Sequence, residues 1–233
     1  HNTKNEICYM LPFADPCPRP LRMESNASDP RDRILETARD LIRRFGGAKT
    51  NVVDIAQAMG LSHSAIYRHF RSKAEIFDAL AAATMAEEAA LAETFVNTDA
   101  PAAERLAALV LTLHRNKRAK FADDPEMHAL YRRIVEERPD LVSDYARRMT
   151  GLLRLILADG VARGEFGTMD LDAAAGAVRD AFTVFIHPAH VEAATKAGVD
   201  QEAGLQTLVA LIISGLASGS VQGGAVRAGY PEK

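Results

Sequence analysis

The stretch Asp54-Ile55-Ala56-Gln57-Ala58-Met59-Gly60-Leu61-Ser62-His63-Ser64-Ala65-Ile66-Tyr67-Arg68-His69-Phe70-Arg71-Ser72-Lys73 predicts two short helices separated by a tight turn. Apolar residues before Gly60 recur at helical spacing, Gly60 ends that helix, and Ser62 can cap a second one. The second helix would turn Ala65, Ile66 and Phe70 inward. This spacing predicts a helix-turn-helix, although a packed corner of two helices without any further role has the same spacing.

The outward positions of the second helix favour the first of these interpretations. They carry Ser64, Tyr67, Arg68 and His69, which can donate hydrogen bonds to phosphates or base edges. An ordinary solvated helix more often carries Glu and Lys of alternating sign. The segment from Arg31 to Lys73 contains nine Lys or Arg against four Asp or Glu, so it carries a charge of +5 while the whole chain carries −3. A basic segment on an acidic body is typical of a small nucleic-acid-binding module.

The order Asp54-Ile55-Ala56, Gly60-Leu61-Ser62, then Ile66 through Lys73 closely resembles the DNA-binding domain of the TetR family of bacterial transcriptional regulators. The resemblance implies that a helix enters the major groove and that phosphate contacts set its register. Arg68 and His63 depart from the family's commonest residues, and Arg68 could donate bidentately to a guanine. The DNA-facing positions implied by the resemblance are Ser62, His63, Ser64, Ala65, Tyr67, Arg68 and His69, with Tyr67, His69 and Lys73 on phosphates and Thr50 or Asn51 across the groove.

The rest of the sequence predicts an all-α protein. Of its 233 residues 48% are hydrophobic, Trp is absent, and no run of alternating β-branched residues appears. Residues 28–73 would form the helix-turn-helix domain, beginning with a helix capped by Ser28 or Asp29 and running to Phe45. Residues 74–220 would form a larger regulatory domain for ligand binding and dimerisation. Six helices are expected in it. The first runs from Lys73 to about Phe95, the second from about Leu106 to Lys120, and the third from Pro125 until residues 136–139 close it. The fourth includes Leu141–Val161, the fifth runs from Asp170 or Asp172 to about Pro188, and the last covers about 201–219.

The two ends of the sequence lack helical periodicity. Residues 1–27 contain four prolines and are expected to be a poorly ordered tail or an upstream remnant, with Met23 a candidate native start, and residues 221–233 are expected to fray. Both cysteines, Cys8 and Cys17, lie in the first segment, which favours a reducing, cytoplasmic location. The longest apolar run, Leu205 to Ala217, is too short to cross a bilayer, so no membrane partner is expected.

A small-molecule effector is implied by the resemblance, because the family's regulatory bodies hold a pocket among these helices. Few charged residues interrupt the apolar positions of the helices over 141–186, which favours an apolar or aromatic effector, and no cofactor is expected. The basic group from His114 to Lys120 is interpreted as a solvated helix end. His187 and His190 lack a third ligand, so no metal site is predicted. Candidate pocket residues are Met85, Phe95, Leu113, Tyr131, Met149, Phe182 and Phe185, each of which could instead be ordinary core.

The last helix is apolar on more than one face. It requires cover either from its own monomer or from a second copy, and the TetR resemblance implies that the last two long helices of each subunit form a dimer interface. Candidate interface residues are Val178, Leu205, Leu208, Val209, Ile212, Ile213 and Leu216.

Together these patterns predict a ligand-responsive transcriptional regulator. We expect a homodimer that binds a palindromic operator in double-stranded DNA, acts as a repressor and is released by its effector. The alternative is a helical small-molecule-binding protein with weak or vestigial DNA binding. Catalytic residues are not predicted, because no nucleophile elbow, phosphate-binding loop, dinucleotide fingerprint or zinc-protease motif is present in the sequence.

Overall fold

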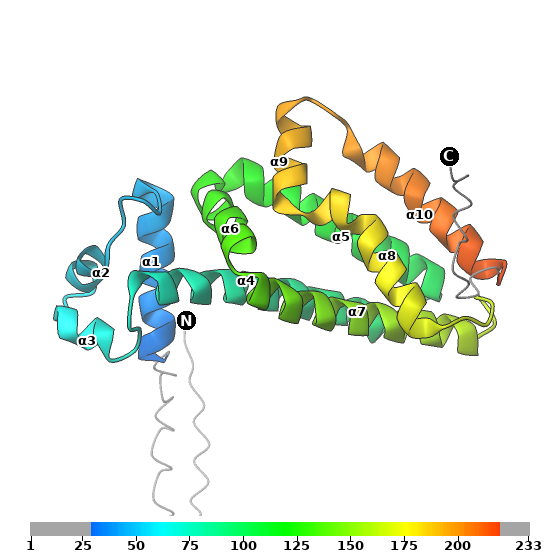
Figure 1. Ribbon diagram of the computed structural model, residues 1–233, viewed down its shortest axis with the longest axis horizontal. Coiled ribbons are helices and arrows are strands. Elements are labelled where there is room, and N and C mark those ends of the chain that lie inside the picture. The colour runs from blue at the N-terminus through cyan, green and yellow to red at the C-terminus, as the bar shows by residue number, and fades with distance from the viewer. Residues whose placement is uncertain (1–28, 220–233) are drawn as a thin grey trace, which may run out of the picture.

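The structure, a computed structural model, describes residues 29–219, which fold into ten helices and no strand (Figure 1). This confirms the all-α prediction. The expected tails, together with Cys8 and Cys17, lie outside the described residues. The helices are α1 (Pro30–Phe45), α2 (Val52–Ala58), α3 (His63–Tyr67), α4 (Lys73–Val96), α5 (Ala102–Asp123), α6 (Pro125–Glu137), α7 (Pro139–Ala162), α8 (Leu171–Ile186), α9 (Pro188–Lys196) and α10 (Gln201–Ala217).

The helix starts in the first half of the chain are set by local capping. The Asp29 carboxylate accepts from the Arg31 amide at 2.9 Å, and the Ser72 hydroxyl accepts from the Glu75 amide at 3.1 Å. Each bond satisfies an amide that has no partner inside its own helix. Gly60, with a φ of +65°, supplies the left-handed conformation that the turn between α2 and α3 requires. These starts agree with those predicted from the sequence.

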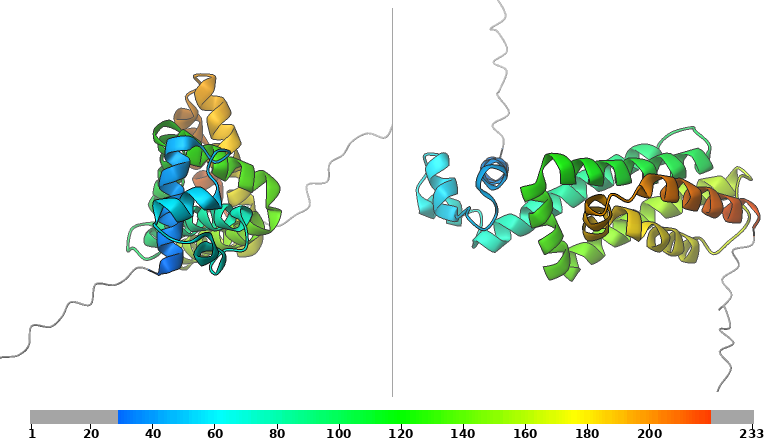
Figure 2. Two further views of the ribbon diagram at one scale, coloured as in Figure 1. Left: turned by 90° about the vertical axis from the view of Figure 1, so that its left-hand side faces the viewer. Right: turned by 90° about the horizontal axis from the view of Figure 1, so that it is seen from above.

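Helices α1 to α3 form a module, here called the N-terminal module, at one end of an elongated molecule (Figure 1). Helix α4 leaves this module and runs into the remaining helices, where it packs against α5, α6 and α7 (Figures 1 and 2). The remaining helices α5 to α10 form the body. Helix α4 therefore connects the two parts directly.

Two hydrophobic cores divide the molecule. The first contains Ile34 and Phe70 of the N-terminal module, but it continues through Leu80 of α4 to Ile134 of α6. The second fills the body. Because the first core includes residues of α6, a movement of α6 must disturb side chains that pack under the N-terminal module.

Several helix boundaries in the body differ from those expected. Pro188, expected to end a helix, is also the first residue of α9, a helix that the sequence did not predict. The His187 ring nitrogen Nδ1 accepts from the Ala189 amide at 3.3 Å and so caps α9. Proline is favoured at the first position of a helix because its missing amide needs no partner there. Helix α5 extends to Asp123 rather than ending at Lys120.

Neither a membrane span nor a metal cluster is found in the part of the chain that the structure describes. None of the helices in residues 29–219 is both long and apolar enough to cross a bilayer. Over the same residues no group of three or more His, Cys, Asp or Glu side chains is arranged to hold a metal ion. The rings of His187 and His190 lie 5.2 Å apart, centre to centre, without such a group around them.

Candidate nucleic-acid interface

Helix α3 presents polar side chains to solvent and apolar ones to the module core. The Ser62 hydroxyl caps the helix by accepting from the Ala65 amide at 3.3 Å. Ile66 lies in the core and is 0% exposed, whereas Tyr67 is 44% exposed. The rings of His63 and Tyr67, one helical turn apart, meet edge to face at 4.7 Å. The exposed polar side chains on and next to α3 are Ser62, His63, Ser64, Tyr67, Arg68 and His69.

A second polar group lies where α4 begins. The Lys73 ammonium is 3.3 Å from the Ala48 carbonyl oxygen and 3.4 Å from Oδ1 of Asn51. Burial is the main cause that lowers the pKa of Lys73, and Arg133 lowers it further, while Asp54 opposes both. Asn51 is exposed at the start of α2. Lys73 and Asn51 are thus brought together as a pair of polar groups.

Two residues predicted to face DNA do not reach the surface. Thr50 is only 2% exposed, and its hydroxyl donates to the Gly46 carbonyl oxygen at 3.0 Å. Its hydroxyl holds the turn after α1, and of the two alternatives Thr50 and Asn51 only Asn51 is exposed. Ala65 is 8% exposed because it packs on the inner side of α3. Its assignment as a DNA-facing residue is corrected to a core position.

The body contains a cavity of about 140 Å³, here called the inner cavity, between α4, α5, α6, α7 and α8. Met85, Tyr131 and Met149, predicted as pocket residues, line it. Leu113 and Phe182 instead line a separate void of about 20 Å³ in the body core. Phe95 and Phe185 line neither space. Residues of the inner cavity that the sequence analysis missed are Lys117, Val135, Val142, Tyr145, Ala146, Arg179, Thr183, Ile186, His187 and Pro188.

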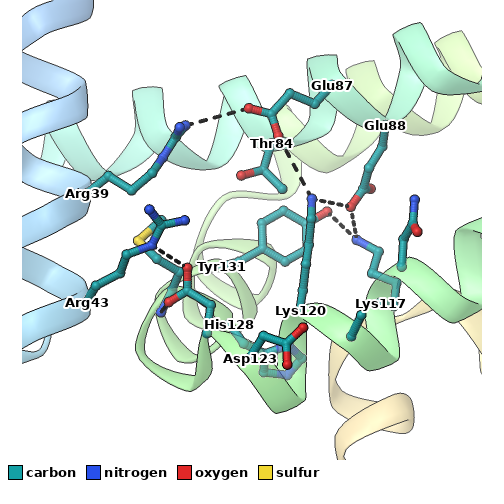
Figure 3. A pocket seen from close by; sticks show the side chains of 14 residues that line it. Arg39, Arg43, Thr84, Glu87, Glu88, Lys117, Lys120, Asp123, His128 and Tyr131 are labelled. Atoms are coloured by element: carbon teal, nitrogen blue, oxygen red, sulfur yellow. Dashed lines mark hydrogen bonds and ion pairs between the residues drawn. The ribbon is translucent and has the colours of Figure 1, made fainter.

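A wider opening of about 350 Å³, here called the outer cleft, lies between α1 of the N-terminal module and helices α4, α5 and α6 (Figure 3). Lys117 and Tyr131 line both spaces and so form the wall between them. Charged side chains of both signs line the cleft, and several of them pair across it: Arg39 with Glu87 at 3.6 Å, and Arg43 with Asp124 at 2.7 Å. The second pair joins α1 to the residue that caps α6.

The wall contains a buried ion pair, which contradicts the interpretation of residues 114–120 as a solvated helix end. Lys117 and His114 are 5% and 0% exposed. The Lys117 ammonium lies 2.7 Å from Oε1 of Glu88, itself 4% exposed. Burial lowers the pKa of Lys117, and the negative charge of Glu88 opposes that shift. The His114 ring nitrogen Nδ1 bonds to the Phe185 carbonyl oxygen at 2.7 Å. Only Arg115 and Arg118 of this group are as exposed as expected.

Two known domain families match this chain. Residues 34–80 match the family described as bacterial regulatory proteins, tetR family. Residues 102–205 match the one described as tetracyclin repressor-like, C-terminal domain. The chain belongs to the TetR family. The first match covers the helix-turn-helix with the start of α4, and the second covers most of the body, including every lining residue of the inner cavity except Met85.

Relatives of this TetR-family chain carry the names of regulators. The HTH-type transcriptional regulator TtgR of Pseudomonas putida is 39% identical over 59 residues, which are 25% of this chain and 28% of TtgR. The HTH-type transcriptional regulator TcmR of Streptomyces glaucescens is 31% identical over 137 residues, 55% of this chain and 58% of TcmR. Both matches span less than two thirds of the relative. The names are not those of enzymes, in agreement with the sequence analysis.

The fold also matches solved TetR-family structures. A transcriptional regulator of the TetR/AcrR family from Thermobifida fusca aligns with a TM-score of 0.58 and 22% identity, over 81% of this chain and 98% of the other. At that identity the match concerns the fold alone. It extends over both the N-terminal module and the body.

Several residues predicted to form a dimer interface on the last two long helices lie instead in the core of their own chain. Val178, Leu205, Val209 and Leu216 are at most 5% exposed and pack inside their own chain. They belong to the body core, which corrects their assignment to the interface. Leu208, Ile212 and Ile213 are partly buried against the same core. The large apolar side chains that this TetR-family chain exposes on α8 and α10 are Val184 and Leu211, at 44% and 65%.

Acidification is expected to destabilise this TetR-family chain through His128. The ring is 5% exposed, and its Nε2 lies 3.3 Å from a carboxylate oxygen of Glu192, which links α6 to α9. Burial lowers the pKa of His128 below its ordinary 6.5, more than Glu192 raises it. The unfolded chain therefore takes up the proton first. The stability that neutral His128 contributes is therefore fully present above pH 6.5. It declines as the pH falls toward the lower pKa of the folded state.

Urea unfolding at about pH 7.5 and about pH 5.5 tests this dependence. His128→Gln should show a smaller loss of stability between the two pH values than the unsubstituted chain. The dependence should persist in part, because burial also lowers the pKa of His187. His190→Gln is the control, since that side chain is exposed. An equal loss in His128→Gln and the unsubstituted chain would contradict the assignment.

Proposed function

We propose that this chain is a DNA-binding transcriptional regulator that acts as a homodimer, and that a small-molecule effector releases it from a palindromic operator as expected of a repressor. The observation that carries the proposal is the exposed polar face of α3, held on a buried apolar base beside Lys73 and Asn51. In a helix-turn-helix the second helix enters the major groove and polar groups around it hold phosphates. The names of TtgR and TcmR support the same role.

The effector part of the proposal rests on the position of the cavities. The outer cleft lies between α1 and the body, and ion pairs join α1 to α4 and α6 across it. A ligand that moves α4 or α6 would therefore change the orientation of the N-terminal module. In a dimer two modules must lie about 34–36 Å apart to enter successive major grooves, so a small rotation is enough to weaken binding. Ligand binding and DNA binding are coupled if the ligand binds one orientation of the module more tightly than the other.

The dimer part rests on α8 and α10. These helices pack against each other and expose Val184 and Leu211 on the side away from the body core. A symmetric contact between two copies would cover both side chains. The two-fold axis of such a contact would also relate the two N-terminal modules, as a palindrome requires.

Replacing Tyr67 or Lys73 by alanine should weaken binding to DNA from upstream of the gene that encodes this protein. Tyr67→Ala would remove a hydroxyl that can donate to a phosphate, and Lys73→Ala would remove a cation. The slope of log affinity against log salt should fall by about one unit for Lys73→Ala. Fluorescence anisotropy across a salt series measures both effects.

Arg118→Ala is the matched control, because it removes one cation from an exposed position on α5, within the body. It should leave both affinity and salt slope unchanged. Unchanged DNA affinity in both Tyr67→Ala and Lys73→Ala would contradict the assignment of these residues to the DNA-binding site. Equal affinity for upstream and random DNA would instead favour a helical small-molecule-binding protein with vestigial DNA binding.

A further inference from the structure

The lining of the inner cavity combines an apolar body with cationic groups. Met85, Val142 and Met149 contribute apolar surface, and the rings of Tyr131 and Tyr145 add to it. The charged side chains that line it are Lys117 and Arg179, and none of the described residues that line it is an Asp or Glu. Its volume of about 140 Å³ is close to the roughly 150 Å³ of an apolar cavity that holds benzene. The space thus suits one ring with an acidic group.

Lys117 is the cation best placed to bind that group. Its ammonium lies 3.2 Å from the Tyr131 hydroxyl and 2.7 Å from Oε1 of Glu88. Glu88 lines the outer cleft but not the inner cavity, so Lys117 stands between a carboxylate on one side and the cavity on the other. A buried ammonium needs an anionic partner, because removal from water otherwise favours its neutral form. Either Glu88 or a ligand acid can be that partner.

Glu88 keeps other partners if Lys117 turns away. Its Oε2 accepts from the Tyr145 hydroxyl at 3.0 Å, and the Lys120 ammonium lies 3.5 Å from its Oε1. Burial and the charge of Glu88 raise the pKa of both Tyr131 and Tyr145 well above 10.0, so both phenols remain donors at neutral pH. Loss of Lys117 would leave Glu88 bonded and paired, which avoids the cost of an isolated buried carboxylate.

We propose that the effector is a small organic acid with one apolar ring, whose carboxylate binds Lys117 and the Tyr131 hydroxyl in competition with Glu88. This inference rests on the proposed ligand-responsive function. It refines the expectation of an apolar or aromatic effector by adding the negative charge. A cationic ligand would meet two cations and no carboxylate in the cavity lining, and a neutral ligand would leave the competition unchanged.

The same ion pairs lead from the cavity to α1. Lys120 lies 3.5 Å from Glu88 and 4.0 Å from Glu87, and Glu87 lies 3.6 Å from Arg39 of α1 (Figure 3). When the ligand takes Lys117, Glu88 draws Lys120 closer and away from Glu87. The contact of Glu87 with Arg39 changes with it. Occupation of the inner cavity is thereby transmitted to the N-terminal module.

Calorimetric titration of the full chain with three probes of similar shape tests the charge. Benzoate, benzamide and benzylamine carry a negative, a neutral and a positive group on the same ring. Benzoate should bind about tenfold or more tightly than benzamide, as a charge-assisted bond to a buried cation implies. Benzylamine should bind most weakly. Equal binding of benzoate and benzamide, or tighter binding of benzylamine, would overturn the proposal.

Substitutions of the ion pair separate competition from mere packing. Glu88→Gln keeps a partner for Tyr145 but removes the competing charge, so benzoate should bind about tenfold more tightly. In Lys117→Met/Glu88→Gln, where neither charge of the pair remains and Arg179 is the cation left in the lining, benzoate should lose most of its advantage over benzamide. Arg118→Met, an exposed change on the same helix, should alter nothing. Unchanged or weaker benzoate binding by a folded Glu88→Gln variant would contradict the competition.

The transmission has its own readout. Glu87→Gln should bind benzoate normally, but benzoate should then reduce its DNA affinity several-fold less than that of the unsubstituted chain. DNA binding without benzoate separates the two levels of inference. If the unliganded chain binds upstream DNA but benzoate neither binds the chain nor releases the DNA, the effector inference fails and the regulator proposal stands. If no specific DNA binding is found while benzoate binds Lys117, the regulator proposal fails and the acid site stands.

Discussion

Leu211→Glu is expected to convert the proposed homodimer into monomers and to lower the affinity for a palindromic operator by about 10²- to 10⁴-fold, the gain that joining two binding modules provides. Leu211 is 65% exposed on α10, so the change should cost the monomer little. In a dimer built from α8 and α10, the same change would bury a carboxylate beside its symmetry mate. The effect should therefore concern assembly rather than folding.

Light scattering after size exclusion measures the assembly, and gel-shift titration with whole and half operators measures the binding. The Leu211→Glu chain should bind a half operator as the unsubstituted monomer would. Leu155→Glu is the matched control, because Leu155 is 49% exposed on α7. A Leu211→Glu chain that remains dimeric would exclude the α8 and α10 surface as the interface. Dissociation by the Leu155 variant would extend the interface to α7.

Phe70→Ala should unfold the N-terminal module and abolish DNA binding while the body stays folded. The Phe70 ring is 1% exposed in the first core, and the Arg31 guanidinium lies over it, 4.7 Å from its centre. Removal of a buried phenylalanine costs about 3–5 kcal/mol. That loss is a large fraction of the roughly 5–15 kcal/mol that stabilises a typical domain, although part of the first core lies on α4 and α6. The body has its own core around Leu106, Ile156 and Phe182 and should retain its structure.

Hydrogen exchange separates these outcomes, because amides of α1 to α3 should exchange rapidly while those of α5 and α7 stay protected. The variant should remain dimeric. Phe45→Ala serves as the control, since Phe45 is 50% exposed at the end of α1 and its loss should leave protection unchanged. Normal protection of α1 in the Phe70 variant would mean that the module does not depend on this side chain.

Local patterns predicted the N-terminal module well. Capping by Ser62 and Ser72 and the left-handed turn at Gly60 involve bonds within four residues of each other along the chain. Such bonds form wherever the chain folds locally, so spacing alone reveals them. Outward positions on α3 follow from helical periodicity for the same reason. Ala65 was misassigned because the resemblance to other regulators outweighed the inward position that periodicity had given it.

The body illustrates where such patterns stop. The run from His114 to Lys120 has the composition of a solvated helix end, yet Lys117 is buried because Glu88 approaches it from α4. Helix α9 was missed because Pro188 signals a helix end as well as a helix start, and only the packing of Val191 decides between the two. Contacts between residues far apart along the chain leave no periodic trace.

The sequence by itself determined the helical class, the helix-turn-helix and its exposed polar face, because caps, glycine turns and helical periodicity act over a few residues. Only the tertiary structure decided that Thr50 holds a turn, that Leu211 rather than Val209 is open to a partner, and that Lys117 and Tyr131 separate two cavities. These depend on how whole helices pack. Burial of a side chain is set by its neighbours in space, which local sequence does not specify.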